Sequence, residues 1–239
     1  MKIGLLVIAT NDYTDFLQPL ITSADKHLLK ERSYGGRTTK LDVTYFVFSN
    51  KDLNLQSDRD IIYTKVHHKP WPWMTLGRYH IFHEVHDKLK DMDFLYYCDS
   101  DMLFVDAVGQ EILGERVGTI HPGFLGGRGT PESNPQSTAY IPANVPVSYC
   151  AGGFNGGSSS EFLAMAEKLS RNISQDFHNG IIAIWHDESH LNRYYAEFAP
   201  TVRLDPSYCY PESWDLPFPK KLLALDKNHE EIRKEDGSS

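Results

Sequence analysis

Two aspartates separated by a single serine are the residues best placed for chemistry. Asp99 and Asp101 flank Ser100 directly after the apolar run at 94–98, which predicts a buried strand. Two carboxylates at the end of such a strand are costly without a cation, and Mn²⁺ or Mg²⁺ would take their oxygens and bridge to the oxygens of a diphosphate. The pattern therefore indicates a metal-assisted site for a nucleotide sugar, whereas an isolated Asp-x-Asp is usually a solvated turn.

A second acidic pair lies in the segment 185–190 (WHDESH), at the start of a predicted helix. Asp187 and Glu188 either favour the helix dipole, or Glu188 faces an oxocarbenium-like centre while Asp187 accepts hydrogen bonds from sugar hydroxyls. The residues alone leave both interpretations open. His186 and His190, four residues apart, also suggest a zinc hydrolase, but an aspartate replaces the glutamate of H-E-x-x-H and no third ligand lies at a recognisable spacing.

Alternating strands and helices are expected to position these residues. Strands are predicted over 2–9, 41–48, 60–65 and 94–98, and helices over 13–29, 76–89, 159–171 and 186–198, with a basic turn at 35–37. This order predicts a single-domain α/β fold with a mainly parallel sheet. Ligands of such sheets gather at the carboxyl ends of the strands.

The texture of the chain changes after residue 120. A loop rich in Gly, Pro and Ser covers 123–135, and short apolar runs follow at 139–141 and 147–151. We therefore expect a catalytic domain over 1–225, made of a nucleotide-sugar-binding half (1–120) and an irregular, acceptor-facing half (121–225). The charged segment 226–239 alone predicts a mobile tail.

Composition argues against several classes of function. The 239 residues carry a formal net charge of −8, so binding to nucleic acid or to an anionic membrane would need a basic patch that the sequence does not show. Cys98, Cys150 and Cys209 form no C-x-x-C pair and are expected to be reduced thiols of a cytoplasmic protein. The apolar run at 3–9 is too short for a membrane span, so we expect neither a signal peptide nor a membrane anchor.

Seven motifs occur in one order between residues 3 and 233. They are FLYYCDSDMLF, VGQEILG, GTIHPGF, STAYIP, AGGFNGG, IWHDESHLNRYY and DKNHEEIR. Through these motifs the chain resembles glycosyltransferase family 6, the family of the histo-blood group A and B transferases and the α-1,3-galactosyltransferase. Within the family it most resembles the compact microbial or viral members. The resemblance implies a GT-A-type fold and a retaining enzyme that transfers N-acetylgalactosamine or galactose from a UDP-sugar to a glycan acceptor in α-1,3 linkage.

The resemblance also implies roles for individual residues on the donor side. Asp99 and Asp101 match the metal- and donor-binding aspartates, and because both acids are retained, dependence on Mn²⁺ or Mg²⁺ is expected. Arg78 matches an arginine that contacts the donor sugar and these carboxylates. The implied donor-binding set is Ile8, Ala9, Thr10, Tyr13, Arg78, Asp99, Ser100, Asp101, Ala151, Gly152, Gly153, His186, Asp187, Lys227 and Arg233.

The remaining implied roles concern catalysis, the acceptor and the choice of sugar. Glu188 matches the carboxylate proposed as nucleophile or as stabiliser of a cationic transition state. The implied acceptor-binding residues are His121, Trp185 and Glu212. Small residues at 151 and 153 leave room for an acetamido group, so UDP-GalNAc is expected ahead of UDP-galactose. Lys227 and Arg233 match a C-terminal segment that folds over the bound nucleotide.

One segment departs from the family pattern. Residues 126–137 read GGRGTPESNPQS, where the family usually carries an aromatic and basic stretch, FTYERR. That stretch helps to shape the acceptor side, so the departure bears on the acceptor more than on the donor. Use of UDP-glucose, or an inactive sugar-binding homologue, stays open as an alternative to the implied activity.

Overall fold

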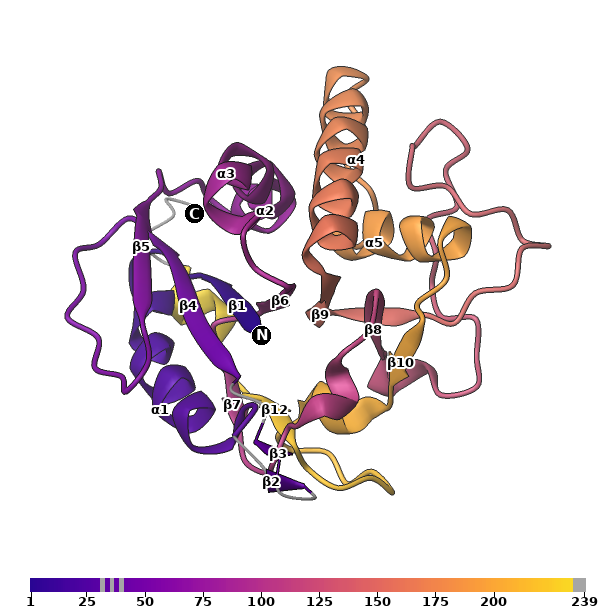
Figure 1. The fold of residues 1–239 in the computed structure, drawn as a ribbon. Coiled ribbons are helices and arrows are strands. Elements are labelled where there is room, and N and C mark those ends of the chain that lie inside the picture. The colour runs from indigo at the N-terminus through magenta and orange to yellow at the C-terminus, as the bar shows by residue number, and fades with distance from the viewer. Residues whose placement is uncertain (31–32, 35–36, 39–40, 234–239) are drawn as a thin grey trace.

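A seven-stranded sheet forms the centre of the computed structural model, which describes residues 1–30, 33–34, 37–38 and 41–233 (Figure 1). The strands lie in the order β10-β8-β9-β6-β1-β4-β5, and β9 is antiparallel to both of its neighbours while the other pairs are parallel. The strands are β1 (Lys2–Ile8), β4 (Asp42–Ser49), β5 (Ile61–Lys65), β6 (Phe94–Cys98), β8 (Arg116–Ile120), β9 (Cys150–Ser158) and β10 (Val202–Leu204). The predicted α/β fold with a mixed, mainly parallel sheet is confirmed.

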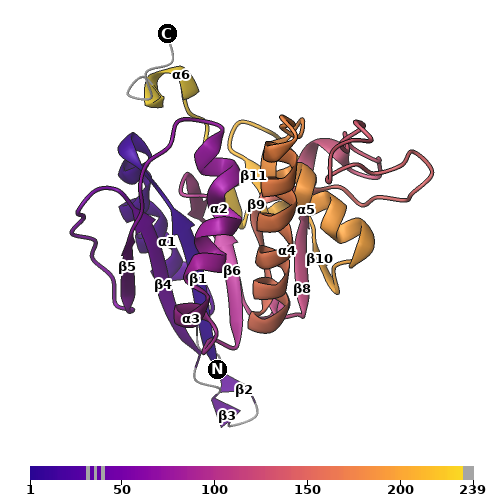
Figure 2. The same cartoon turned by 90° about the horizontal axis from the view of Figure 1, so that it is seen from above.

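Helices cover one face of this sheet, and a helix with a small second sheet covers the other (Figures 1 and 2). The apolar strand runs are buried on both faces, as β1 shows: Leu5 packs toward α1, whereas Leu6 packs toward α2 and α4. The helices are α1 (Leu17–His27), α2 (Trp73–Glu84), α3 (His86–Leu89), α4 (Ser159–His178), α5 (His186–Glu197) and α6 (His229–Ile232).

The small sheet brings the C-terminal segment beside the Asp-x-Asp turn. It consists of β7 (Met102–Phe104), β11 (Tyr210–Pro211) and β12 (Leu222–Ala224), in the order β11-β12-β7. Because β12 is antiparallel to β7, the chain leaves β12 next to the residues that precede β7. The amide of Leu225 donates to the carbonyl of Asp101 at 3.0 Å, so the tail starts at the predicted metal site.

Helix boundaries differ from the sequence-based expectation in three places. The helix predicted over 13–29 begins as a 3₁₀ turn (Asn11–Phe16) and continues as α1, and the helix predicted over 76–89 starts at Trp73 and breaks at Val85. The helix predicted to end at 171 continues to His178 as α4, because buried Ile173 and Asp176 extend its inward face.

Strand β9 is the main element that the sequence did not predict in full. Only the run 147–151 stood out, yet the strand covers Cys150–Ser158 through a glycine-rich stretch. A Cβ on Gly156 would lie 2.4 Å from the carbonyl oxygen of Leu95, and one on Gly157 would lie 2.0 Å from that of Glu115. Glycines are therefore required there by close approach of neighbouring backbone, and the run at 139–141 forms no strand.

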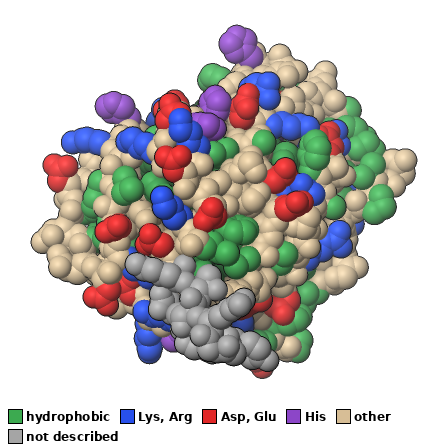
Figure 3. Space-filling view, viewed as in Figure 1, with side chains coloured by type: hydrophobic (Ala, Val, Ile, Leu, Met, Phe, Trp, Pro, Cys, Tyr) green, Lys and Arg blue, Asp and Glu red, His purple; other side chains and the backbone are tan. Residues whose placement is uncertain are grey.

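Two further expectations concern segments at the edge of the described chain. Strands β2 (Ser33–Tyr34) and β3 (Arg37–Thr38) flank the predicted basic turn, whose Gly35 and Gly36 lie outside the described residues, as does the tail beyond Arg233. Among the helices that the structure describes, none combines the length and the apolar character needed to cross a bilayer. Acidic and basic side chains are interspersed on the face shown in Figure 3.

Candidate active site

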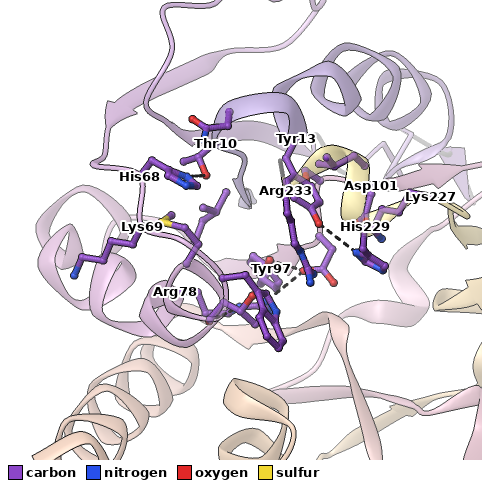
Figure 4. A pocket seen from close by; sticks show the side chains of 18 of the residues that line it. Thr10, Tyr13, His68, Lys69, Arg78, Tyr97, Asp101, Lys227, His229 and Arg233 are labelled. Carbon is purple, nitrogen blue, oxygen red and sulfur yellow. Dashed lines mark hydrogen bonds and ion pairs between the residues drawn. The ribbon is translucent and has the colours of Figure 1, made fainter. Parts of the chain in front are cut away.

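A cavity of about 540 Å³ opens at the carboxyl ends of β1 and β6 (Figure 4). Five separate segments line it, and they include residues from both halves of the chain and from the tail. The predicted site residues that line it are Ile8, Thr10, Tyr13, Arg78, Asp99, Ser100, Asp101, Trp185, Glu188, Lys227 and Arg233. The strand-end argument therefore leads to one place in the fold, in which the predicted metal, catalytic and tail residues meet.

Arg78 is the buried link between the two acidic pairs. Its guanidinium lies 3.4 Å from Asp99 Oδ1 and 3.1 Å from Asp187 Oδ2, and it stacks 4.2 Å from the centre of the Tyr97 ring. The side chain is 8% exposed. Burial lowers the pKa of Arg78, but Asp187 and then the other neighbours raise it, and the net shift is upward. Arg78 thus stays charged and holds the carboxylates of Asp99 and Asp187 on either side of itself.

The two aspartates of the Asp-x-Asp turn each keep an oxygen available. The Tyr97 hydroxyl donates to Asp99 Oδ1 at 2.5 Å, and the Lys227 ammonium pairs with Asp101 Oδ2. Asp99 Oδ2 and Asp101 Oδ1 have no protein partner within the described residues. Hard oxygens of this kind suit a divalent cation.

A divalent cation at this turn would need further ligands from outside the protein. No cluster of three or more His, Cys, Asp or Glu side chains able to hold a metal occurs in the part of the chain that the structure describes. Asp99 and Asp101 therefore fit a cation whose remaining ligands are phosphate oxygens and water, as Mg²⁺ and similar ions adopt with nucleotide substrates.

Glu188 is fixed to strand β9 and keeps one face toward the cavity. Its Oε2 accepts the amide hydrogen of Gly152 at 2.8 Å. The side chain of Asn192, one turn further along α5, donates to the carbonyls of Cys150 and Glu188 at 2.8 and 2.9 Å and accepts from the Cys150 amide at 2.8 Å. Helix α5 is thereby clamped to β9, which sets the position of the carboxylate.

Burial makes Asp187 and Glu188 weaker acids than ordinary carboxylic acids. It raises the pKa of Glu188 to about 7, an effect that the Gly152 amide opposes and Asp187 reinforces. Burial likewise raises the pKa of Asp187 to about 6, against the attraction of Arg78. Such shifts are common where a carboxylate acts on a reacting centre.

The described part of the tail lies over the cavity. The side chain of Asn228 caps α6 by accepting from the amides of Glu230 and Glu231. The Tyr13 hydroxyl lies 3.4 Å from His229 Nδ1, and the Arg233 guanidinium lies 4.9 Å from the centre of the Trp71 ring (Figure 4). These contacts place His229 beside the residues that follow β1, and Arg233 beside the segment between β5 and α2.

Several predicted donor residues lie behind the cavity wall. Ala9 and Ala151 are buried, and Asp187 stands behind Arg78 at 3% exposure. Gly152 supplies the amide that holds Glu188, and a Cβ on Gly153 would lie 3.1 Å from Asp99 Oδ2. These residues shape and hold the groups that face the cavity.

The other predicted contacts, on the acceptor side, are more widely spread. Trp185 lines the cavity, whereas the ring of His121 packs 4.7 Å from Phe124. Glu212 Oε2 accepts from the amide of Asp226 at 3.0 Å, where the tail begins. Trp185 is therefore the predicted acceptor residue that the structure brings directly to Glu188.

The two histidines considered as zinc ligands point to different neighbours. The His186 ring lies edge-on to Trp71 at 4.9 Å. His190 is buried with its Nε2 3.7 Å from Asp176 Oδ2, and burial lowers its pKa to about 4. The two rings thus do not form the shared site of the H-E-x-x-H type.

The segment between β5 and α2 contributes cavity residues that sequence reasoning missed. His68, Lys69 and Trp71 of this segment line the cavity, and so do Met74 and Thr75 in the first turn of α2. His68 Nδ1 lies 2.8 Å from the hydroxyl of Thr10, which joins this segment to the end of β1. A signal was present, since the basic and aromatic run HHKPWPW directly follows a predicted parallel strand.

Known proteins resemble this chain over nearly its full length. A family model described as glycosyltransferase family 6 matches residues 1–234. The histo-blood group ABO system transferase 1 of Rattus norvegicus is 33% identical over an alignment that covers 97% of this chain and 68% of that protein. The globoside alpha-1,3-N-acetylgalactosaminyltransferase 1 of Gallus gallus is 30% identical, over 98% of this chain and 69% of its own. The O-antigen biosynthesis glycosyltransferase WbnI of Escherichia coli is 26% identical, over 96% and 97%.

Proposed function

Because the chain belongs to glycosyltransferase family 6 and is thus a hexosyltransferase, we propose that it transfers N-acetylgalactosamine or galactose from a UDP-sugar to a glycan acceptor in α-1,3 linkage, with retention of configuration. The family implies a nucleotide-sugar donor and a glycan acceptor, and the fold agrees with the GT-A type. One observation carries the proposal. The Asp99–Asp101 turn, the Glu188 carboxylate and the tail cations line a single cavity.

The diphosphate of the donor is assigned to the Asp-x-Asp side of the cavity. Asp99 and Asp101 would hold Mn²⁺ or Mg²⁺ through their free oxygens, and the ion would supply positive charge to the departing UDP. Lys227 and Arg233 would add two further positive charges from above. The uracil and ribose then lie toward Ile8, Thr10 and Tyr13.

The anomeric carbon of the donor sugar is assigned to the Glu188 side. The ionised carboxylate, held by the Gly152 amide, would stabilise the positive charge that develops on that carbon, or capture it as a nucleophile. Because its pKa is about 7, Glu188 is fully ionised only above neutral pH. Arg78 keeps Asp187 and Asp99 in place on either side of this region.

UDP-GalNAc is the donor we propose first. The resemblance to the family supports it, because Ala151 and Gly153, the positions matched to the choice of sugar, are small residues that add no bulk behind the cavity wall. The relative from Gallus gallus is named as an N-acetylgalactosaminyltransferase, which is in line with this choice. The proposed acceptor-binding residues are Trp185, His121 and Glu212.

UDP release from separate UDP-sugars tests the proposal. The protein is incubated with UDP-GalNAc, UDP-galactose or UDP-glucose, with Mn²⁺ or with EDTA. We expect Mn²⁺-stimulated release from the first two donors, which Asp101→Asn abolishes. Asp91→Asn is the matched control, because Asp91 is exposed and lies before the opposite end of β6. Release from UDP-glucose alone would favour that alternative, and the absence of both release and nucleotide binding would favour an inactive homologue.

A further inference from the structure

The loop that departs from the family pattern, residues 126–137, is anchored by its own side chains. The guanidinium of Arg128 donates to the carbonyls of Ile141 at 3.2 Å, Pro142 at 2.7 Å and Val145. Three hydrogen bonds from one guanidinium thus hold residues 141–145 against the start of the loop. The loop is therefore held in a defined conformation before any ligand binds.

The centre of the same loop reaches the residues in front of α5. The hydroxyl of Thr130 accepts the indole N–H of Trp185 at 2.7 Å. Two residues later, Glu132 accepts the amide hydrogen of Ile184 at 2.7 Å through a carboxylate that is 6% exposed. Gly129, with φ of +69°, allows this approach, because a Cβ there would lie 2.5 Å from the Tyr149 ring. Thr130 and Glu132 thus hold two consecutive residues, Ile184 and Trp185, of which Trp185 lines the cavity.

The orientation of the Trp185 ring depends on contacts made outside the cavity. Its side chain is 47% exposed, lines the cavity and precedes Glu188 by three residues. A large, half-exposed ring can rotate unless its polar edge is fixed, and ordering it on binding costs affinity. Thr130 fixes that edge from outside, since it is not among the described residues that line the cavity.

We propose that Thr130 is a positioning residue that orients the Trp185 indole as a fixed wall of the acceptor subsite and thereby contributes to acceptor specificity. The inference rests on the proposed function, in which Trp185 contacts the acceptor sugar. Pyranose rings have an apolar face that can stack on an aromatic ring. An indole held in one orientation therefore favours acceptors whose apolar sugar face can stack on it in that orientation. Thr130 does not line the cavity, and Tyr149 stands between it and Glu188, so we expect hydrolysis of the UDP-sugar to be retained when Thr130 is replaced.

The test compares Thr130→Val with Thr130→Ser and with Thr138→Val. Valine keeps the shape and loses the acceptor oxygen, whereas serine restores it. Thr138→Val is the matched control, because Thr138 directly follows this loop and its hydroxyl donates a hydrogen bond to the carbonyl of Asn172, away from the cavity. The first readout needs no substrate. It is the ¹⁵N-indole NMR signal of Trp185, assigned with Trp185→Phe, and the rate at which its N–H exchanges with water.

We expect Thr130→Val to shift this signal and to speed its exchange, and we expect both other variants to leave it unchanged. The second readout is transfer to lactose or N-acetyllactosamine, whichever the wild-type protein uses faster. Thr130→Val should raise the acceptor KM by about 3- to 10-fold, the range of one hydrogen bond, with metal-stimulated UDP-sugar hydrolysis retained.

Three outcomes would overturn the inference. An unshifted indole signal in Thr130→Val removes the positioning role. A shifted signal with an unchanged acceptor KM removes the link to specificity, and an equal effect of Thr138→Val reduces the role to loop stability. If the wild-type protein instead hydrolyses no UDP-sugar, the proposed function fails, while the indole signal still decides the contact between Thr130 and Trp185.

Discussion

Replacing Glu188 with glutamine should stabilise the protein at alkaline pH. The wild-type carboxylate is charged there although it is only partly exposed, and glutamine has the same shape without the charge. Its side-chain oxygen can still accept the hydrogen bond from the Gly152 amide. The substitution therefore removes mainly the cost of burying a negative charge.

The magnitude follows from the pKa. Burial raises the pKa of Glu188 from its usual 4.5 to about 7. Because the folded-state pKa lies above the unfolded value, the carboxyl favours folding most at low pH, and this stability is lost as the pH rises from about 4.5 through 7. The loss amounts to about 3 kcal/mol at pH 8 and to less than about 1 kcal/mol at pH 5. Glu188→Gln, which cannot ionise, avoids it at every pH.

The assay is urea denaturation of both proteins at pH 5 and pH 8. We expect the variant to gain about 3 kcal/mol in the free energy of unfolding at pH 8 and little at pH 5, while losing transfer activity. Glu115→Gln serves as the control, because that side chain is 70% exposed and should show no such gain. A variant that is no more stable than the wild type at pH 8, or equally stabilised at both pH values, would refute the reasoning.

Two further predictions concern Arg78 and the tail. Arg78→Met should lower the free energy of unfolding by about 3–5 kcal/mol in urea denaturation, because it leaves buried Asp187 without its cation. Adding Asp187→Asn should recover part of this loss, and a simple sum of the two single effects would contradict the pairing. Ending the chain after Leu225 should lower the transfer rate at least about tenfold, because Lys227 and Arg233 no longer reach the diphosphate. Ending it after Arg233 should preserve the rate, and equal rates for the two truncated proteins would rule out a role for the tail cations.

Much of the fold could be predicted from the sequence, because strands buried on both faces leave continuous apolar runs. β1, β4 and β6 are of this kind. β9 escaped prediction because its pattern is set by the space between β6 and β8, where glycine is required by neighbouring backbone atoms. Close approach of this kind is a property of the folded molecule and leaves only a glycine-rich stretch in the sequence.

The candidate site shows the same division. Asp99 and Asp101 could be found because a strand end precedes them, and Glu188 because it starts a helix in a matching motif. The lining residues His68 and Lys69 belong to an irregular segment, whose composition marks it as a candidate but has no periodic pattern to show which side chains face the cavity. The burial of Arg78 was equally hidden, because the pattern of α2 does not show which polar side chain turns inward.

The two ends of the described chain lie at opposite ends of the parallel strands. Met1 precedes β1 at the amino ends of the parallel strands, whereas Arg233 lies over their carboxyl ends, above the cavity (Figure 2). Attachment to a resin, sensor chip or fusion partner through Met1 therefore leaves the cavity mouth unobstructed. The same attachment beyond Arg233 would hinder the movement of the segment proposed to cover the donor. The position of the tag should therefore affect the measured affinity for the UDP-sugar.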